Sequence, residues 1–300
     1  MFKKHLLGAV NLTIPFIVFY LISPVFIVSL QGRLVSALFF GIYLYYLNSK
    51  QAKNLTNSLK FSPSGVFKEV WKKELDHCQI PEGMVKLRYA YTAENIAMAV
   101  NQTVILDPLL WSSIQEDPEA QKVQDIFHNL IEAGLSERQK ACLINIRAAL
   151  SEPVQRFIFR HELAHVIHKF SRNKLRLIFL SGVIFSFIGL SVAVAFLPIN
   201  GFLAIIAGML VGGVMDLILV FVINYFFKLK QERQADIFAL RFSTSEEINQ
   251  VATFFEKHQE ILDTYGEKNF FASYLPSTVL IGYPNGKKRA AWLRRLVSCS

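Results

Sequence analysis

Four runs of apolar residues divide this chain into alternating apolar and polar stretches. They cover residues 6–30, 34–47, 177–197 and 202–227, and the single charged side chain within them is Asp216. A run of roughly 20 apolar residues is long enough to cross a bilayer as a helix. The whole chain is 52% hydrophobic and 18% charged, which is typical of a membrane protein. We therefore expect four transmembrane helices in two hairpins, at residues 1–50 and 176–228.

The distribution of positive charge indicates a topology for these helices. The formal net charge is +9, but Lys and Arg gather at the ends of the apolar runs and form no single basic stripe, which argues against a nucleic-acid partner. The two short turns within the hairpins hold only Arg33. The positive-inside rule then places both termini and all the polar segments in the cytoplasm of a multi-pass membrane protein. Three cysteines without a CxxC pair fit a reducing compartment.

The polar segments, residues 51–175 and 229–300, are expected to form one mainly α, α+β domain. Apolar residues recur at helical spacing at Phe67, Trp71 and Leu75, and they alternate along residues 85–91 as in a strand with one buried face. Two further short strands, 96–100 and 103–106, complete a predicted antiparallel sheet. The remaining helices are expected to begin near residues 123, 136, 151, 230, 245 and 286.

The sequence His161-Glu162-Leu163-Ala164-His165 carries the clearest chemical signal in the chain. Residues four apart on a helix share a face, so the two imidazoles can point at one metal ion with Glu162 beside them. Two nitrogen ligands and a carboxylate that takes a proton from water are typical of a catalytic zinc site. We therefore expect one Zn²⁺ per chain.

A catalytic zinc ion needs a third protein ligand. His168 is too far from His161, since seven residues of helix span about 10 Å. Glu232 and Asp236 are better placed, because two carboxylates four residues apart also share a helix face. We predict that Glu232 binds the metal and that Asp236 accepts the other N–H of a ligating histidine, most simply that of His161.

These two motifs, with a pair of apolar runs between them, resemble the integral-membrane zinc endopeptidases related to the bacterial protease HtpX and the CAAX prenyl endopeptidases. The four-span layout resembles the HtpX branch. The resemblance implies a zincin-like (gluzincin) catalytic domain in the cytoplasm, attached to a bacterial-type inner membrane. It also implies an active-site edge strand after Asn95, while Tyr283 and Arg289 stand where the family has a histidine before a basic helix, and they become possible contacts for substrate or transition state.

The expected activity is hydrolysis of peptide bonds in unfolded or membrane-protein substrates at the cytoplasmic membrane face, as in protein quality control. Glu162 would be the catalytic base, and the substrate would extend along the edge strand near residues 97–100. The alternative is an inactive membrane scaffold or adaptor that retains the metalloprotease fold. A receptor-type zinc peptidase with a separate sensor domain is disfavoured, because the predicted external turns are short.

Overall fold

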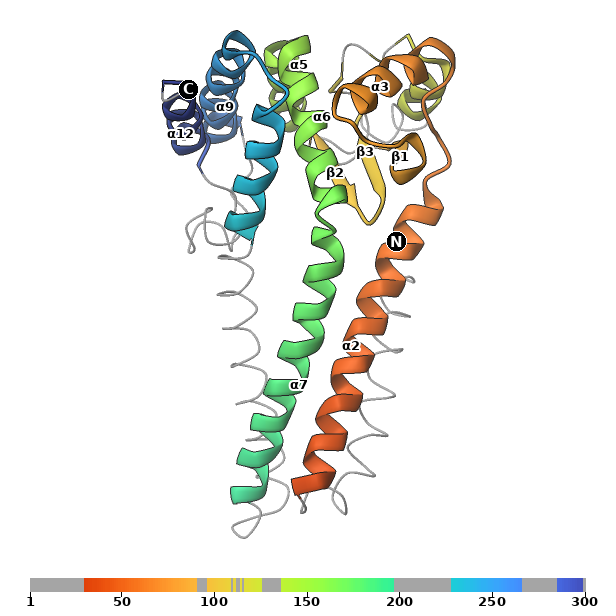
Figure 1. Ribbon diagram of the computed structural model, residues 1–300, viewed down its shortest axis with the longest axis vertical. Helices are drawn as coiled ribbons and strands as arrows, with labels where there is room; N and C mark the ends of the chain where they lie inside the picture. The colour runs from red at the N-terminus through yellow and green to blue at the C-terminus, as the bar shows by residue number, and fades with distance from the viewer. Residues whose placement is uncertain are drawn as a thin grey trace. The chain divides into compact units, whose positions relative to one another are not determined.

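The computed structural model describes residues 30–90, 96–108, 110, 111, 114, 116–125, 136–196, 228–265 and 285–298 (Figure 1). The chain forms two compact units. Residues 1–50 and 174–222 make up the first, and residues 51–173 and 223–300 make up the second. Over the described residues the protein is mainly helical with one small sheet.

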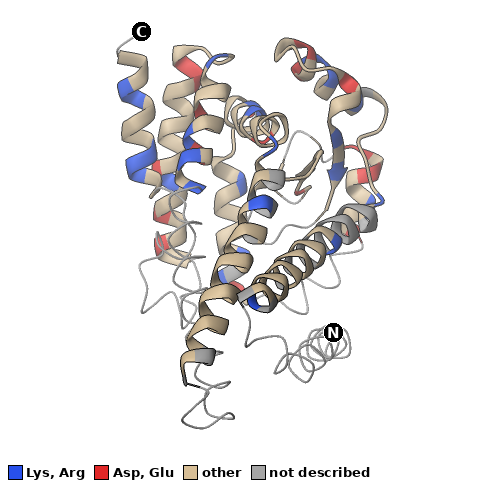
Figure 2. Ribbon diagram, turned by 60° about the horizontal axis from the view of Figure 1, so that its bottom comes forward, with Lys and Arg blue, Asp and Glu red and all other residues tan. Residues whose placement is uncertain are grey.

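The first unit contains most of two long helices, α2 (Leu30–Ser58) and α7 (Phe170–Phe196). They pack closely at Gly41, where an added Cβ would collide with the side chain of Val183 and the carbonyl oxygen of Phe179. Figure 2 shows long stretches of both helices without charged residues. Large apolar side chains are exposed on them, namely Leu34, Val35, Leu38, Phe39, Ile42, Tyr45, Tyr46, Leu180 and Ile184.

The predicted membrane spans fall partly outside the described residues. The runs at 6–30 and 202–227 are almost wholly among the residues left undescribed. Within the described part of the chain, no helix has both the length and the hydropathy needed to cross a membrane. The predicted turn at residues 31–33 is wrong, because these residues are helical and α2 continues through the polar residues 48–58.

The second unit is built from helices that begin and end close to the predicted positions. α3 (Gly65–His77) and α5 (Glu137–Ala149) precede α6 (Glu152–Ile167), and α9 (Ser245–Tyr265) and α12 (Gly286–Ser298) follow in the last part of the chain. A further helix spans the described residues 228–240. Ser151 precedes α6, and Pro153 lies in its first turn, where a missing N–H costs no helical hydrogen bond.

The sheet is mixed, which corrects the predicted antiparallel sheet. Its strands are β1 (Lys86–Tyr89), β2 (Ala97–Val100) and β3 (Thr103–Leu106), in the order β1-β3-β2. β2 and β3 pair antiparallel, but β1 pairs parallel with β3. All four residues of β3 are buried, so the most apolar strand takes the centre. The chain after β1 returns as β2 on the far side of β3, and this return sets β1 parallel to β3.

α6 lies at the centre of the second unit, between the sheet and the last helices. It packs against β2 and β3 on one side and against α9 on the other (Figure 1). Aromatic rings fill the core around α6: the ring centroids of Trp71 and Phe159 are 4.6 Å apart, and those of Trp71 and Trp111 are 5.5 Å apart. The position of α6 is therefore determined on both sides by buried apolar contacts.

α12 is held against α9 by a close approach at its first residue. An added Cβ at Gly286 would collide with the carbonyl oxygen of Phe255 and crowd the side chain of Gln259. The amide of Gly286 also donates a hydrogen bond of 3.1 Å to the side-chain oxygen of Gln259. A glycine at this position therefore allows the start of α12 to contact the backbone of α9.

We expect Gly286→Ala to destabilise the second unit by about 1–3 kcal/mol, because a methyl group inserted into a close-packed contact forces the backbone to shift. Thermal unfolding would measure the loss. Gly83→Ala is the matched control, since nothing lies within 4 Å of a Cβ built at Gly83. Equal melting temperatures for the two variants would contradict the packing argument.

Candidate metal centre

The histidine motif lies on α6, most of whose residues are buried. Of its residues, His161 is 3% exposed and Glu162 is 6% exposed. The apolar residues of α6 explain this burial, because Val154, Phe157 and Leu163 belong to the core that surrounds the helix. Polar side chains in such a setting need partners, since an unpaired buried polar group is costly.

The helix of residues 228–240 supplies those partners. Glu232, Ala235, Asp236 and Ala239 recur at helical spacing and are each at most 2% exposed. Ala235 packs with Ala164 of α6 and with Phe170. Because both helices present an alanine at this contact, their backbones approach closely enough for short carboxylate side chains to reach the histidines.

Three donor groups converge between these two helices. The Nε2 atoms of His161 and His165 are 3.1 Å apart, and Glu232 Oε2 lies 3.1 Å from His161 Nε2. The second carboxylate oxygen of Glu232 lies 3.7 Å from His165 Nε2. One ligand atom from each of the three residues can be chosen so that all lie within 4.8 Å of one another.

Asp236 contacts the opposite side of the His161 ring. Its Oδ1 lies 2.8 Å from His161 Nδ1. Because an ionised carboxylate can only accept a hydrogen bond, Nδ1 carries a proton and is the donor. Nε2 is then the nitrogen that faces Glu232 and His165. Arg289 of α12 donates from Nε to Asp236 Oδ2 at 2.9 Å and from Nη2 to Asp236 Oδ1. The Arg289 guanidinium also stacks 4.0 Å from the centre of the Phe255 ring.

The same surroundings shift the pKa values of Glu162 and Asp236 in opposite directions. Burial, together with the neighbouring charge of Glu232, outweighs the charges of His161 and Arg289 and raises the pKa of Glu162 to about 7. Burial also disfavours ionisation of Asp236, but Arg289 and the hydrogen bond from His161 outweigh it and lower the pKa to about 2. Asp236 is therefore a permanent anion, whereas Glu162 can exchange a proton near neutral pH.

The pKa values of the two histidines are also shifted in opposite directions. Burial by itself lowers the pKa of His161, but the hydrogen bonds and charges of Asp236 and Glu232 outweigh burial and raise the pKa to about 9. Burial and the charge of His161 together lower the pKa of His165 to about 4. A positive charge is therefore favoured between Asp236 and Glu232.

These residues fit a divalent metal ion. Two imidazole nitrogens and one carboxylate oxygen are a donor set that suits zinc, and the carboxylate on Nδ1 of His161 is the usual outer partner of a ligating histidine. The net negative charge of Glu232 and Asp236, which raises the pKa of His161, equally favours a bound cation. Of the three donors His165 is the most exposed, so the centre opens on its side.

Comparison with known proteins gives the chain a family. Residues 130–296 match the model of peptidase family M48, and this match covers more than half of the chain. The chain belongs to peptidase family M48. Searches of curated proteins and of solved structures return no match to it.

Membership of family M48 implies metallopeptidase activity, and the matched region contains His161, His165 and Glu232. The predicted membership of a metallopeptidase family is thus confirmed.

The structure of this M48 peptidase brings together most of the predicted site residues. His161, His165, Glu232, Glu162 and Asp236 meet at one place, and His168 lies outside the group. The His168 ring instead stacks on Phe170, with centroids 5.3 Å apart. Asn95 and Tyr283 lie outside the described residues.

Arg289 occupies a different position from the predicted contact with substrate. It is 8% exposed and binds Asp236, behind His161. The family resemblance suggested Arg289 as a possible contact for substrate or transition state, but no sequence signal identified Asp236 as its partner. The sequence also left Arg160, directly before the motif, without a role.

We expect the metal-free protein to lose stability as the pH rises from 7 to 9. The raised pKa of His161 means that its charged form stabilises the fold below the ordinary value of 6.5, and this contribution is lost as the pH rises through about 9. The contribution of Glu162 is already lost by about pH 7. Thermal unfolding in chelator at each pH would measure the decline.

His161→Gln is the matched variant for this titration, because glutamine keeps a polar side chain without a titrating proton. Its melting temperature should change much less between pH 7 and 9. An equal decline in this variant and in the wild type would show that other groups cause the pH dependence.

Proposed function

We propose that this M48 peptidase is a zinc-dependent endopeptidase in which His161, His165 and Glu232 hold the metal. The observation that carries the proposal is the convergence of these three donors, with atoms within 4.8 Å, beside a buried carboxyl group whose pKa is near neutral. Zinc, when bound, supplies a Lewis acid that makes water acidic near neutral pH and polarises a carbonyl group.

Glu162 is the proton carrier of the proposed reaction. With a pKa of about 7 it accepts a proton from the attacking water and later returns it to the leaving amine. Asp236 keeps the proton of His161 on Nδ1, so Nε2 presents its lone pair to the metal. Arg289 keeps Asp236 ionised. Glu162 and Asp236 thus have separate tasks that follow from their surroundings.

The substrate is proposed to bind as an extended chain along β2. β2 is an edge strand, and its two-residue loop to β3 makes Val100 and Thr103 the closing pair. Hydrogen-bonded and open pairs alternate in an antiparallel ladder, so the backbone groups of Ala97 and Ala99 point away from β3. The amide of Ala99 also hydrogen-bonds Glu162, which joins this edge to the catalytic carboxyl group. Backbone pairing at an edge favours unfolded or frayed polypeptides.

Glu162→Gln tests the activity and distinguishes it from the scaffold alternative. We expect the rate of casein cleavage to fall about 100- to 10,000-fold, because the proton carrier is removed. Zinc content per chain should not change. Glu152→Gln is the control on the same helix, since Glu152 is largely exposed. Cleavage at the wild-type rate by Glu162→Gln would exclude the mechanism, and an active wild type without zinc would exclude the metal.

We further propose that the protein is an integral membrane protein of the HtpX branch, with its catalytic unit in the cytoplasm at a bacterial-type inner membrane. Membrane proteins with exposed cytoplasmic segments are then its substrates in protein quality control. Support comes from the exposed apolar side chains of α2 and α7, since contiguous apolar surface marks a lipid or protein contact. The uncharged runs at residues 34–47 and 177–196 support the same proposal.

Membrane fractionation tests this attachment. We expect the full-length protein to float with membranes and to stay there through washes with high salt and with alkaline carbonate, because apolar burial is insensitive to both. A peripheral membrane protein in the same preparation serves as the control and should be released. Recovery in the carbonate supernatant would contradict integral attachment.

A further inference from the structure

Arg160 is a buried cation next to the metal-binding motif that the proposed reaction does not use. It precedes His161 directly and is 4% exposed. Charged side chains are buried only when they are paired, because removing a charge from water is costly. The partners of Arg160 therefore indicate what its position in α6 requires.

Arg160 binds α3 through a two-point contact. Its Nε donates to Glu74 Oε2 at 3.0 Å, and its Nη2 donates to Glu74 Oε1 at 3.3 Å. This arrangement fixes the plane of the guanidinium, since both nitrogens on one edge are occupied. The other terminal nitrogen, Nη1, then has a determined direction.

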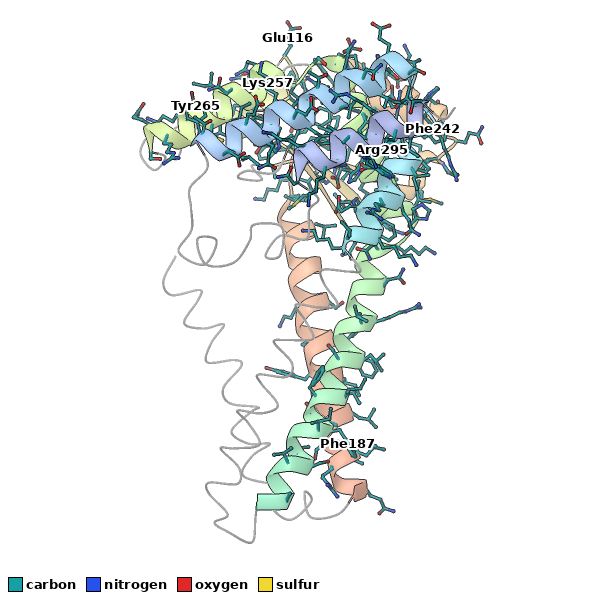
Figure 3. All side chains as sticks on the ribbon, turned by 90° about the vertical axis from the view of Figure 1, so that its left-hand side faces the viewer. Glu116, Phe187, Phe242, Lys257, Tyr265 and Arg295 are labelled. Carbon is teal, nitrogen blue, oxygen red and sulfur yellow. The ribbon has the colours of Figure 1, made fainter. Side chains whose placement is uncertain are left out.

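Nη1 of Arg160 points to the end of the helix that carries Glu232. It donates to the carbonyl oxygen of Phe242 at 2.5 Å and to Ser243 Oγ at 3.1 Å. Figure 3 labels Phe242 where the helix of residues 228–240 ends. Phe242 lies in the turn that follows this helix, and the amides of Phe242 and Ser243 bond back to the carbonyl groups of Ala239 and Leu240. A cation beside this end is favoured by the negative end of the helix dipole. Arg160 thus joins the start of the histidine motif to the end of the helix of residues 228–240, which we call the ligand helix because it carries Glu232.

The ligand helix is consequently held at two places. Asp236 binds His161 and Arg289 in its middle, and the Phe242 carbonyl binds Arg160 at its end. Glu232 lies one turn before Asp236, on the side away from Phe242. A rotation or slide of this helix would move the carboxylate of Glu232 away from the histidine nitrogens, and the contact with Arg160 opposes that movement.

We propose that Arg160 is a positioning residue that sets the zinc affinity of the centre by holding the ligand helix against α6. This inference rests on the proposed function, because it takes zinc as the metal and Glu232 as a ligand. The competing explanation is that Arg160 only stabilises the fold, as buried ion pairs often do when one partner is removed. The two explanations differ in what they predict for metal affinity at equal loss of stability.

Four variants of the full-length protein separate these explanations. Arg160→Gln removes the charge, and Arg160→Lys keeps the charge without the planar fork that reaches Glu74 and Phe242 together. Arg156→Gln is the matched control, since Arg156 lies one turn earlier on α6 and, like Arg160, forms an ion pair with Glu247, but it makes no hydrogen bond to Phe242. Asp117→Asn is the stability control, because Asp117 is buried and binds Ser64 and Tyr89.

The measurements are the zinc dissociation constant, from competition with a chelator, and the melting temperature of the zinc-stripped protein. We expect both Arg160 variants to bind zinc roughly 10- to 100-fold more weakly, as for the loss of other groups that orient ligands. Asp117→Asn should stay within about twofold of wild type, since distant sites act independently. Arg156→Gln should do the same, because Arg156 hydrogen-bonds Glu152 and Glu247 and leaves the contacts of Arg160 with Glu74 and Phe242 in place. Asp117→Asn should nevertheless lower the melting temperature.

The outcomes separate the inference from the proposed function. Wild-type zinc affinity in the Arg160 variants, with a lowered melting temperature, would overturn the positioning role and leave the proposed function intact. A wild type that binds no zinc would overturn both. If Arg160→Gln does not fold, Arg160→Lys and Glu74→Gln decide, because Glu74→Gln frees the guanidinium plane while Arg160 stays in place and should weaken zinc binding as well.

Discussion

The rest of the centre depends on the hydrogen bonds that the carboxylate of Asp236 accepts. It is 1% exposed, and it accepts hydrogen bonds from His161 on α6 and from Arg289 on α12 while belonging to a third helix. An anion buried this deeply is stable only if its partners are in place. Three helices that are distant in the chain must therefore assemble together, and their assembly orients His161 toward Glu232. Catalytic geometry and tertiary stability have a common origin here.

Two carboxyl groups on neighbouring helices receive opposite properties from their surroundings. Asp236 accepts hydrogen bonds from a guanidinium and stays ionised, whereas at Glu162 burial outweighs the charges of His161 and Arg289, so this group retains a proton to near neutral pH. The fold achieves this separation with Arg289, which reaches the site because Gly286 allows α12 to approach α9. Gly286, at the start of α12, thus influences the charge state of Asp236 on another helix. This dependence links close packing to acid–base chemistry.

The unit that carries the chemistry is assembled from two separated chain segments, residues 51–173 and 223–300. The histidine motif and its carboxylate partners come from different segments, so the centre forms only when contacts of long sequence separation are made. Such contacts carry a loop-closure cost. Arg160 and Asp236 each bridge the segments, through Phe242 and His161 respectively, and polar contacts of this kind add direction to the non-directional apolar core.

The sequence by itself determined the family, the class of metal chemistry, and the places where most helices and strands begin. These follow from local rules: helical spacing puts His161 with His165 and Glu232 with Asp236, and capping and proline signals mark the start of α6. It did not determine the direction of β1, the continuation of α2 through residues 48–58, or the partners of Arg160 and Arg289. Only the tertiary structure decided these, because strand direction depends on the path of the chain around β3, and the partner of a buried cation depends on which distant helix lies against it.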